Sequence, residues 1–358
     1  MKPTERLHEL GQSLWIDNIS RGMLDEGTLA GYIEELSVTG LTSNPTIFDK
    51  AIGAGDAYDA QIAELHDRGV EGEDLFFELA LADLERAARM FAPVNERTRG
   101  VDGWVSLEVS PLLADDAEAT IAQARELHER AEPNVLIKIP GTEAGRTAIE
   151  ESIFAGVPIN VTLLFDTEQY LGAADAYMRG IERRIEAGLD PAIASVASLF
   201  MSRWDVAIAD EVPDDLRNGL GVAVGRDAYR AYRELLESER WQRLAAEGAV
   251  PQRLLWASTG TKDPDASDVL YIEALAAPLT VNTMPESTLH AFADHGQVGD
   301  PLPADGAGAD EALAAYTDAG IELDELAARL QGEGAAAFVK SWRDLLESVA
   351  SKREQVSI

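Results

Sequence analysis

Residues 134–145 read NVLIKIPGTEAG and place one lysine, Lys138, inside an apolar segment that leads into a turn and a helix start. Side chains alternate between the two faces of a strand, so Lys138 shares a face with Leu136 and Pro140, and the isoleucine on either side of it points the other way. Two apolar faces are typical of a strand buried on both sides. Burial favours the neutral amine that Schiff-base chemistry with a carbonyl requires. The alternative is a structural lysine at a strand end that extends its ammonium group to water.

Eight short segments along the chain have the composition of β-strands, and most of them are followed by a helical pattern. The segments are residues 13–16, 38–42, 101–109, 135–139, 158–165, 193–200, 253–258 and 279–283. Strands that alternate with helices form βαβ units and a parallel sheet. Eight such units predict an α/β fold, the closed (β/α)8 or TIM barrel.

Apolar periodicity predicts helices between the strands, at residues 73–91, 115–130 and 142–155. We also expect extra helices at the N-terminus, in the long gap after the second strand, and at the C-terminus. The whole of 1–358 is interpreted as one domain, with 286–358 as a mainly helical extension packed on the barrel. Within that extension, 323–349 is predicted to be helical with a break at 331–334, and 301–308 to be a loop.

Acidic residues dominate the charge, with 64 Asp and Glu against 30 Lys and Arg and a net charge of −34. Such a surface repels nucleic acid and anionic lipid, so neither is expected as a partner, and solubility or adaptation to salt explains the acidity best. A phosphorylated substrate would need a local cluster of Arg, Lys and backbone N–H groups. No apolar run approaches the length of about 18 residues that spans a membrane, and the N-terminus lacks a signal-peptide core, so a cytoplasmic location is expected.

Metal and thiol chemistry are not expected from the residue types present. The chain has no cysteine, which removes disulfides, thiolate catalysis and cysteine-based metal sites. Its five histidines do not show the close spacing of metal ligands. We therefore expect neither a metal nor an organic cofactor.

Polar residues stand at the predicted C-terminal strand ends, where the active site of a (β/α)8 barrel lies. They are Asp17, Thr42, Ser43, Asn44, Glu108, Lys138, Asn160, Thr162, Ser198, Arg203, Ser258, Lys262 and Asn282. Glu108, Lys138 and Asn160 fall at the same place on adjacent strands, so all three are predicted to project into the barrel. Two structural alternatives stay open: Glu108 as a buried ion-pair partner of Lys138, and Asp17 as the cap of a helix that begins near Ser20.

A basic and hydroxyl-bearing set follows the sixth and seventh strands, namely Arg203, Ser258 and Lys262. The segment WASTGTKDP (256–264) is rich in Ser, Thr and Gly, and it can offer N–H donors as well as hydroxyl groups to a phosphate. It lacks the residue order of a nucleotide-binding loop, as does GTEAG after Lys138. These residues therefore predict a phosphate site without a nucleotide.

Seven segments together resemble the transaldolases, specifically the longer bacterial type of these Schiff-base-forming class I enzymes. They are LTSNPTIF (41–48), VSLEVSP (105–111), VLIKIPGT (135–142), INVTLLF (159–165), SLFMSRWD (198–205), WASTGTKDP (256–264) and TVNTMPESTL (280–289). The resemblance covers roughly residues 10–295. It implies an enzyme of the pentose phosphate pathway that transfers a dihydroxyacetone unit from sedoheptulose 7-phosphate to glyceraldehyde 3-phosphate, giving erythrose 4-phosphate and fructose 6-phosphate.

The resemblance also implies catalytic roles. Lys138 would be the nucleophile that forms a Schiff base with the ketose carbonyl, and Asp17 would take the proton of the C4 hydroxyl while the C3–C4 bond breaks. Glu108 would shuttle protons through a water molecule held by Thr162. The presence of Glu108 and Asp17 on different strands agrees with one carboxylate for each proton-transfer task.

Substrate-binding roles follow from the same resemblance. The hydroxyl groups of the three-carbon unit would be held by Asn44, Asn160 and Ser198. The phosphate would be held by Arg203, Ser258 and Lys262. Some transaldolases carry an arginine in a shorter Ala-Ser-aromatic-Arg segment here, whereas Lys262 is offset by two residues and offers a point charge in place of a bidentate guanidinium.

Two other functions remain open. A fructose-6-phosphate-type aldolase of the same barrel would release free dihydroxyacetone, and the sequence does not settle whether water or an aldehyde resolves the enamine. A non-catalytic barrel that binds sugar phosphates or partner proteins would be expected to lack one or more of Asp17, Glu108 and Lys138, and all three are present. We expect a monomer or a homodimer.

Overall fold

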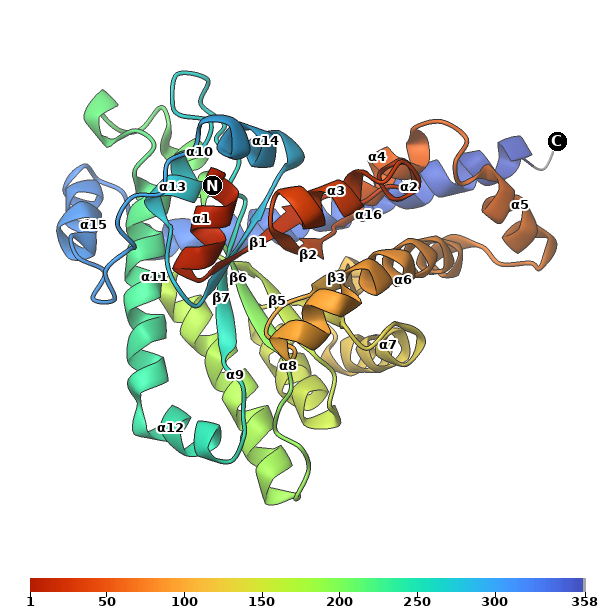
Figure 1. Cartoon of the computed structure of the whole chain (residues 1–358), viewed down its shortest axis with the longest axis horizontal. Helices are drawn as coiled ribbons and strands as arrows, with labels where there is room; N and C mark the ends of the chain where they lie inside the picture. The colour runs from red at the N-terminus through yellow and green to blue at the C-terminus, as the bar shows by residue number, and fades with distance from the viewer. Residues whose placement is uncertain (357–358) are drawn as a thin grey trace.

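A computed structural model describes residues 1–356 and contains a closed barrel of eight parallel strands in sequential order, with β8 paired back to β1 (Figure 1). The strands are β1 (Gln12–Asp17), β2 (Val38–Thr42), β3 (Trp104–Glu108), β4 (Val135–Pro140), β5 (Ile159–Leu164), β6 (Ser195–Phe200), β7 (Gln252–Ala257) and β8 (Thr280–Met284). Each predicted strand overlaps one of these, and the predicted (β/α)8 barrel is confirmed.

The third strand begins later than predicted, at Trp104 instead of residue 101. Gly103 just before it has φ +80°, a left-handed conformation outside an extended run. Asp102 accepts a hydrogen bond from Nε1 of Trp15 in β1 at 2.8 Å. The Asp-Gly pair thus forms a polar turn under the barrel, in keeping with the low strand propensity of both residue types.

Helices alternate with the strands on the outside of the barrel, and others lie before β1, after β2 and after β8, as predicted (Figure 1). They are α1 (Pro3–Leu10), α2 (Arg21–Asp25), α3 (Thr28–Glu35), α4 (Pro45–Gly53), α5 (Asp59–Asp67), α6 (Gly72–Thr98), α7 (Ala117–Arg130), α8 (Glu143–Ala155), α9 (Thr167–Glu186), α10 (Ser202–Ile208), α11 (Leu220–Glu237), α12 (Glu239–Ala246), α13 (Leu270–Ala274), α14 (Glu286–His295), α15 (Ala309–Asp318) and α16 (Leu323–Val356). The three helices predicted between the strands correspond to α6, α7 and α8, and residues 301–308 form a loop.

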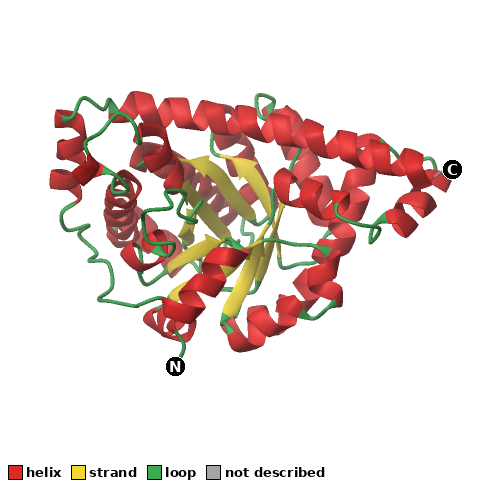
Figure 2. Cartoon of the chain, turned by 90° about the horizontal axis from the view of Figure 1, so that it is seen from above, coloured by secondary structure: helices red, strands yellow, loops and turns green. Residues whose placement is uncertain are grey.

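The helix α16 is continuous, so the predicted break at residues 331–334 is wrong. A Cβ atom on Gly334 would lie 2.9 Å from Cδ2 of Leu163 in β5. The glycine therefore permits a close approach of helix and strand, and that packing offsets its poor helix propensity. The helix packs on α4, α5, α6 and β5, and Figure 2 shows it passing the arrowhead ends of the strands on its way to the C-terminus.

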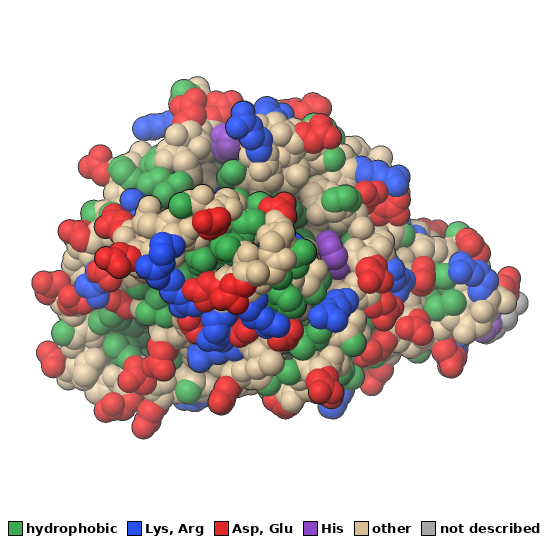
Figure 3. Space-filling view, turned by 90° about the horizontal axis from the view of Figure 1, so that it is seen from below, with side chains coloured by type: hydrophobic (Ala, Val, Ile, Leu, Met, Phe, Trp, Pro, Cys, Tyr) green, Lys and Arg blue, Asp and Glu red, His purple; other side chains and the backbone are tan. Residues whose placement is uncertain are grey.

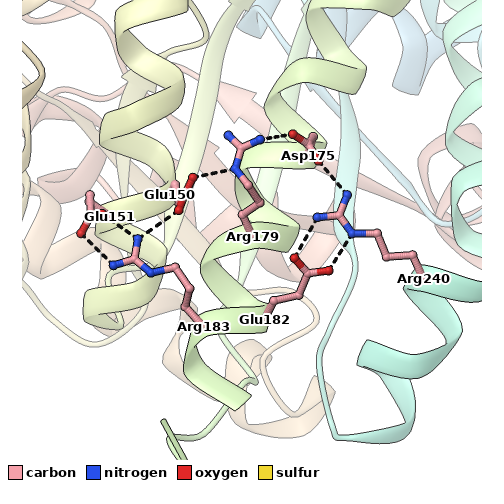
Figure 4. A network of polar contacts seen from close by, with 7 residues as sticks. All are labelled: Glu150, Glu151, Asp175, Arg179, Glu182, Arg183 and Arg240. Atoms are coloured by element: carbon pink, nitrogen blue, oxygen red, sulfur yellow. Dashed lines mark hydrogen bonds and ion pairs between the residues drawn. The ribbon is translucent and has the colours of Figure 1, made fainter. Parts of the chain in front are cut away.

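The charged surface contains a network that joins α8, α9 and α12 (Figure 4). Its members are Glu150, Glu151, Asp175, Arg179, Glu182, Arg183 and Arg240. Arg240 of α12, for example, contacts Asp175 at 2.6 Å and Glu182 at 2.7 Å, both in α9. Figure 3 shows acidic side chains spread over one face with basic ones among them. Shared arginines of this kind reduce the repulsion among crowded carboxylates.

Tight packing inside the barrel gives a first testable prediction. A Cβ on Gly40 of β2 would lie 2.5 Å from Nε1 of Trp15, whereas a Cβ on Gly31 of α3 would meet nothing within 4 Å. We expect Gly40→Ala to lower the free energy of unfolding by about 1–3 kcal/mol through overpacking. Gly31→Ala, the matched control, should raise it by about 0.5–1 kcal/mol because alanine favours the helix.

Urea unfolding of the two variants measures both effects. Equal stability of Gly40→Ala and the wild type would show that Trp15 does not pack closely against Gly40.

Candidate active site

A cavity of about 160 Å³ lies at the C-terminal ends of the barrel strands. It brings together most of the site residues predicted from the sequence: Asp17, Asn44, Lys138, Thr162, Ser198, Arg203, Ser258 and Lys262. Its other lining residues are Thr42, Phe200, Ala257, Gly260, Thr283, Pro285 and Phe338. Of the other polar residues predicted at the strand ends, Thr42 is in the lining, whereas Ser43, Glu108, Asn160 and Asn282 lie outside it.

Lys138 and Glu108 form a buried ion pair. They are direct partners in the register of β4 and β3, and Nζ of Lys138 lies 3.4 Å from Oε2 of Glu108 and 3.3 Å from the carbonyl oxygen of Ser43. Each of the two residues is only 5% exposed. The alternative of a lysine that extends to water is therefore wrong, and the ion pair considered for Glu108 is present.

The carboxyl group of Glu108 is tuned to neutral pH. Burial raises its pKa to about 7, against the opposing effect of the Lys138 charge and hydrogen bond. A carboxyl group with this pKa exchanges protons readily at neutral pH, as an acid–base catalyst must. The pairing and an acid–base role are thus compatible.

Asp17 faces the same cavity from the end of β1. Its Oδ1 accepts a hydrogen bond from the hydroxyl of Thr42 at 2.7 Å, and that hydroxyl contacts the hydroxyl of Thr283 at 2.6 Å. Burial raises the pKa of Asp17, while the charges of Lys138 and Lys262 and the Thr42 hydrogen bond lower it. The carboxylate is therefore oriented by a hydroxyl and stands within the field of two amines.

The alternative role of Asp17 as a helix cap is wrong. The side chain of Ser20 accepts a hydrogen bond from the backbone N–H of Met23 at 3.2 Å and so caps α2. Asp17 precedes this cap, and its carboxylate is left to face the cavity.

Asn160 lies beneath the cavity and is fully buried. Its Nδ2 donates to the hydroxyl of Ser106 at 3.0 Å, and its Oδ1 accepts from the hydroxyl of Ser198 at 2.7 Å. The register pairs it with Lys138, as the sequence predicted. Because its amide is bonded to its neighbours, Asn160 supports Ser198, which does line the cavity.

Thr162 presents an unused hydroxyl group. The side chain is fully buried and lines the cavity, yet its Oγ1 has no hydrogen-bond partner within residues 1–356. The next residue, Leu163, has φ +60° at an irregularity in the pairing of β5 with β6. Strained backbone of this kind is concentrated at functional sites, and an unpaired buried hydroxyl is able to hold a water or substrate atom.

Arg203 lines the cavity from the start of α10, just after β6. Its guanidinium carbon lies 5.2 Å from the ring centre of Phe200. Desolvation lowers the pKa of Arg203, and the carboxylate of Glu333 in α16 raises it in part. The side chain is thus a partly desolvated cation held between β6 and α16.

Ser258 and Lys262 complete the basic end. Ser258 has φ +54°, and its hydroxyl lies 2.9 Å from that of Ser202. Lys262 is exposed but lines the same cavity despite its two-residue offset. The lining thus holds three basic residues, Lys138, Arg203 and Lys262, against one carboxylate, Asp17, with Glu108 beside Lys138, so a chain with net charge −34 has a locally basic pocket.

The sequence matches a known family. The family model described as transaldolase/fructose-6-phosphate aldolase matches residues 14–349. The chain belongs to this family. The family resemblance noted in the sequence is confirmed.

Relatives that bear the name transaldolase match almost the whole length. "Transaldolase 1" of Streptomyces avermitilis is 47% identical over 357 residues, which cover 97% of this chain and 94% of the relative. The transaldolase of Thermobifida fusca is 45% identical over 360 residues and covers 98% of both chains. The transaldolase of Saccharopolyspora erythraea is 45% identical over 359 residues, again with 98% of both chains covered.

Some cavity residues of this family member were missed in the sequence. Thr283 and Phe338 are the main ones, and they come from β8 and α16. A phenylalanine on an amphipathic helix has the same periodic signal as a core residue. A threonine is an ordinary strand former. Phe338 is distinguished from a core residue only by its position near Lys138, and Thr283 from an ordinary strand residue only by its contact with Thr42.

Neither a membrane span nor a metal cluster is found in residues 1–356. None of their helices combines the length and the apolar character needed to cross a bilayer. Their His, Asp and Glu side chains include no group of three or more placed to hold a metal ion. The expectation that this family member needs no metal or cofactor stays a prediction.

The unpaired hydroxyl of Thr162 predicts a separation of activity from stability. Thr162→Val should reduce kcat/KM for aldol transfer about a hundredfold or more. It should leave the free energy of unfolding within about 1 kcal/mol of the wild type or raise it, because no hydrogen bond is lost. Steady-state kinetics and urea unfolding measure the two quantities.

Thr280→Val provides the control. The hydroxyl of Thr280 is fully buried, accepts from Gln12 at 2.8 Å and donates to the carbonyl of Ala277 at 2.7 Å. This variant should lose about 1–3 kcal/mol of stability and keep its turnover. A fall in stability of Thr162→Val as large as that of Thr280→Val would contradict an unpaired hydroxyl.

The raised pKa of Glu108 predicts a pH-dependent contribution to stability. As pH rises from the unfolded value of about 4.5 to the folded value of about 7, the folded protein keeps a proton that the unfolded chain loses, so its stability falls across this window and levels off above pH 7. Relative to the wild type, Glu108→Gln should therefore gain stability as pH rises from 5 to 8, by up to about 3 kcal/mol. Urea unfolding across this pH range tests the sign.

Glu118→Gln, at an exposed position of α7, serves as the control, and its free energy of unfolding should change with pH as that of the wild type does. If the free energy of unfolding of Glu108→Gln also changes with pH as that of the wild type does, Glu108 does not titrate near neutrality.

Proposed function

We propose that the chain is a transaldolase that transfers a dihydroxyacetone unit from sedoheptulose 7-phosphate to glyceraldehyde 3-phosphate, forming erythrose 4-phosphate and fructose 6-phosphate. The observation that carries the proposal is the buried Lys138 amine, 3.4 Å from Glu108, in a cavity that also contains Asp17. Relatives named transaldolase, at 45–47% identity over nearly full length, support transfer.

Formation of the Schiff base needs a neutral amine and a proton carrier. Transfer of one proton from Nζ of Lys138 to Oε2 of Glu108, 3.4 Å away, produces both, and the burial that raises the pKa of Glu108 to about 7 favours its protonated form. The amine then attacks the ketose C2 atom to give a carbinolamine. Glu108 returns the proton to the departing hydroxyl group, water leaves, and an iminium forms. The free hydroxyl of Thr162 is available to hold the water that relays these protons.

Cleavage of the carbon–carbon bond depends on the second carboxylate. Asp17, oriented by Thr42 at 2.7 Å, takes the proton of the C4 hydroxyl. The C3–C4 bond breaks, its electrons move to the iminium, and an aldose leaves while an enamine stays on Lys138. In the second half, C3 attacks the carbonyl carbon of the acceptor and Asp17 returns the proton to the new hydroxyl.

The other cavity residues are assigned to binding. Asn44 and Ser198 hold hydroxyl groups of the three-carbon unit, with Asn160 positioning Ser198 from below. The phosphate is bound by Arg203, Ser258 and Lys262. A cluster of two cations and a hydroxyl is needed because the chain as a whole repels anions.

The family description also includes fructose-6-phosphate aldolase, which is the second candidate. It would share every step up to the enamine and differ only in the group that resolves the enamine. The names and lengths of the relatives favour transfer.

Covalent trapping tests the proposed nucleophile. Treatment of the wild type with fructose 6-phosphate and borohydride should inactivate the enzyme and add a reduced three-carbon unit to Lys138, located by peptide mass spectrometry. Lys138→Ala should show neither adduct nor turnover. Lys340→Ala, an exposed position of α16, should be labelled as the wild type is.

Three outcomes would contradict parts of this proposal. A label on another residue would reject Lys138 as the nucleophile. Equal and negligible rates of the wild type and Lys138→Ala would favour a non-catalytic, sugar-phosphate-binding barrel. Efficient turnover of fructose 6-phosphate without an acceptor would favour the aldolase.

A further inference from the structure

The helix α16 is held over the barrel mouth on the β5 side. Nε2 of Gln331 donates to the carbonyl oxygen of Leu163 at 2.9 Å. Gly334, one turn later, lets the helix backbone approach that residue closely. The hydrogen bond from Gln331 therefore uses a carbonyl group at the irregular part of β5, beside Thr162 in the cavity.

A second group of contacts holds α16 on the side of β2 and β3. The hydroxyl of Thr46 donates to that of Ser341 at 2.9 Å, and Nε1 of Trp342 donates to Oε1 of Glu73 at 2.7 Å. The same Glu73 oxygen accepts from Ser110, two residues after the end of β3, at 2.8 Å. Two side chains of α16 are thus fixed to the segments that carry the β2 and β3 ends.

Between these two groups of contacts, α16 places Phe338 over Lys138. Phe338 lines the cavity, and its ring centre lies 5.5 Å from Nζ of Lys138. The pair Lys138–Glu108 closes the side of β3, so the ring covers the nitrogen from the side of α16. In an intermediate bonded to this nitrogen, the reactive C3 atom is only two bonds away from it.

We propose that Phe338 is a specificity-determining residue, whose ring shields the enamine on Lys138 from protonation by bulk water and so preserves the enamine for an aldehyde acceptor. This inference rests on the proposed transaldolase function. An apolar group at a closed mouth suppresses side reactions of a reactive intermediate with water.

The competing reaction defines what the ring must prevent. Water donates a proton to C3, the enamine π electrons form the new C–H bond, and an iminium and hydroxide result. Hydroxide then adds to C2, the proton of the new hydroxyl moves to nitrogen, the C2–N bond breaks as the carbonyl forms, and dihydroxyacetone leaves with the Lys138 amine restored. Productive transfer instead forms a C–C bond from the same C3 atom. The ratio of dihydroxyacetone release to transfer therefore reports access of water to C3.

The experiment measures this ratio in four proteins: the wild type, Phe338→Ala, Phe338→Leu and Leu346→Ala. Dihydroxyacetone release is followed with fructose 6-phosphate alone, and transfer with fructose 6-phosphate plus erythrose 4-phosphate. Leu346 packs α16 on the core but does not line the cavity, so its truncation loosens the helix without opening the shield directly.

We expect Phe338→Ala to raise the ratio of release to transfer about tenfold or more. Phe338→Leu keeps apolar bulk for folding and should raise it by a smaller factor, about threefold, since part of the shield remains. Leu346→Ala should keep the wild-type ratio even if both of its rates fall. A purely structural role of Phe338 lowers the two rates together and leaves the ratio unchanged.

Two results overturn the inference: a wild-type ratio in both Phe338 variants, or an equal rise in Leu346→Ala. Failure of the proposed function itself looks different, because the wild type would then neither transfer the three-carbon unit nor form a borohydride-trapped adduct on Lys138.

Discussion

The rest of the structure depends on one constraint, the burial of a lysine amine against a carboxylate inside a ring of parallel strands. Removing both charges from water carries a large desolvation penalty, and an apolar pair of similar volume would serve stability as well or better. The barrel tolerates Lys138 and Glu108 because the register of β3 and β4 places them opposite each other, with the Ser43 carbonyl as a third partner. The pair places a carboxyl group, whose pKa burial raises to about 7, at 3.4 Å from the Lys138 nitrogen, as the proposed Schiff-base chemistry requires.

The second constraint is the contrast between the site and the surface. A net charge of −34 opposes the approach of any phosphate ester at long range. The strand ends of β6 and β7 counter this field with Arg203 and Lys262, and the carboxylates Asp17 and Glu108 are kept to the β1 and β3 side. Substrate affinity in such a protein must come from short-range, partly desolvated contacts, because salt screens the exposed charges within about 8–10 Å.

The helix α16 adds what a plain barrel lacks. The strand ends carry the proposed nucleophile, Lys138, and the proposed acid–base groups, Glu108 and Asp17, at the barrel mouth. By crossing it, α16 brings an aromatic ring to Lys138 and a carboxylate, Glu333, towards Arg203. Its continuity through Gly334 shows how a residue that weakens a helix locally becomes acceptable where a strand packs against it.

The sequence alone determined the eight strands, the polar residues at their ends and the common level of Glu108, Lys138 and Asn160, because a two-residue side-chain period and turn residues are local signals. The tertiary structure decided what lies opposite each group. It delayed the start of the predicted third strand until after an Asp-Gly turn, carried α16 through its glycines, bonded Asn160 to two serines and set Phe338 over the lysine. These features follow from contacts between segments far apart in the chain, which no local pattern of apolar and polar residues encodes.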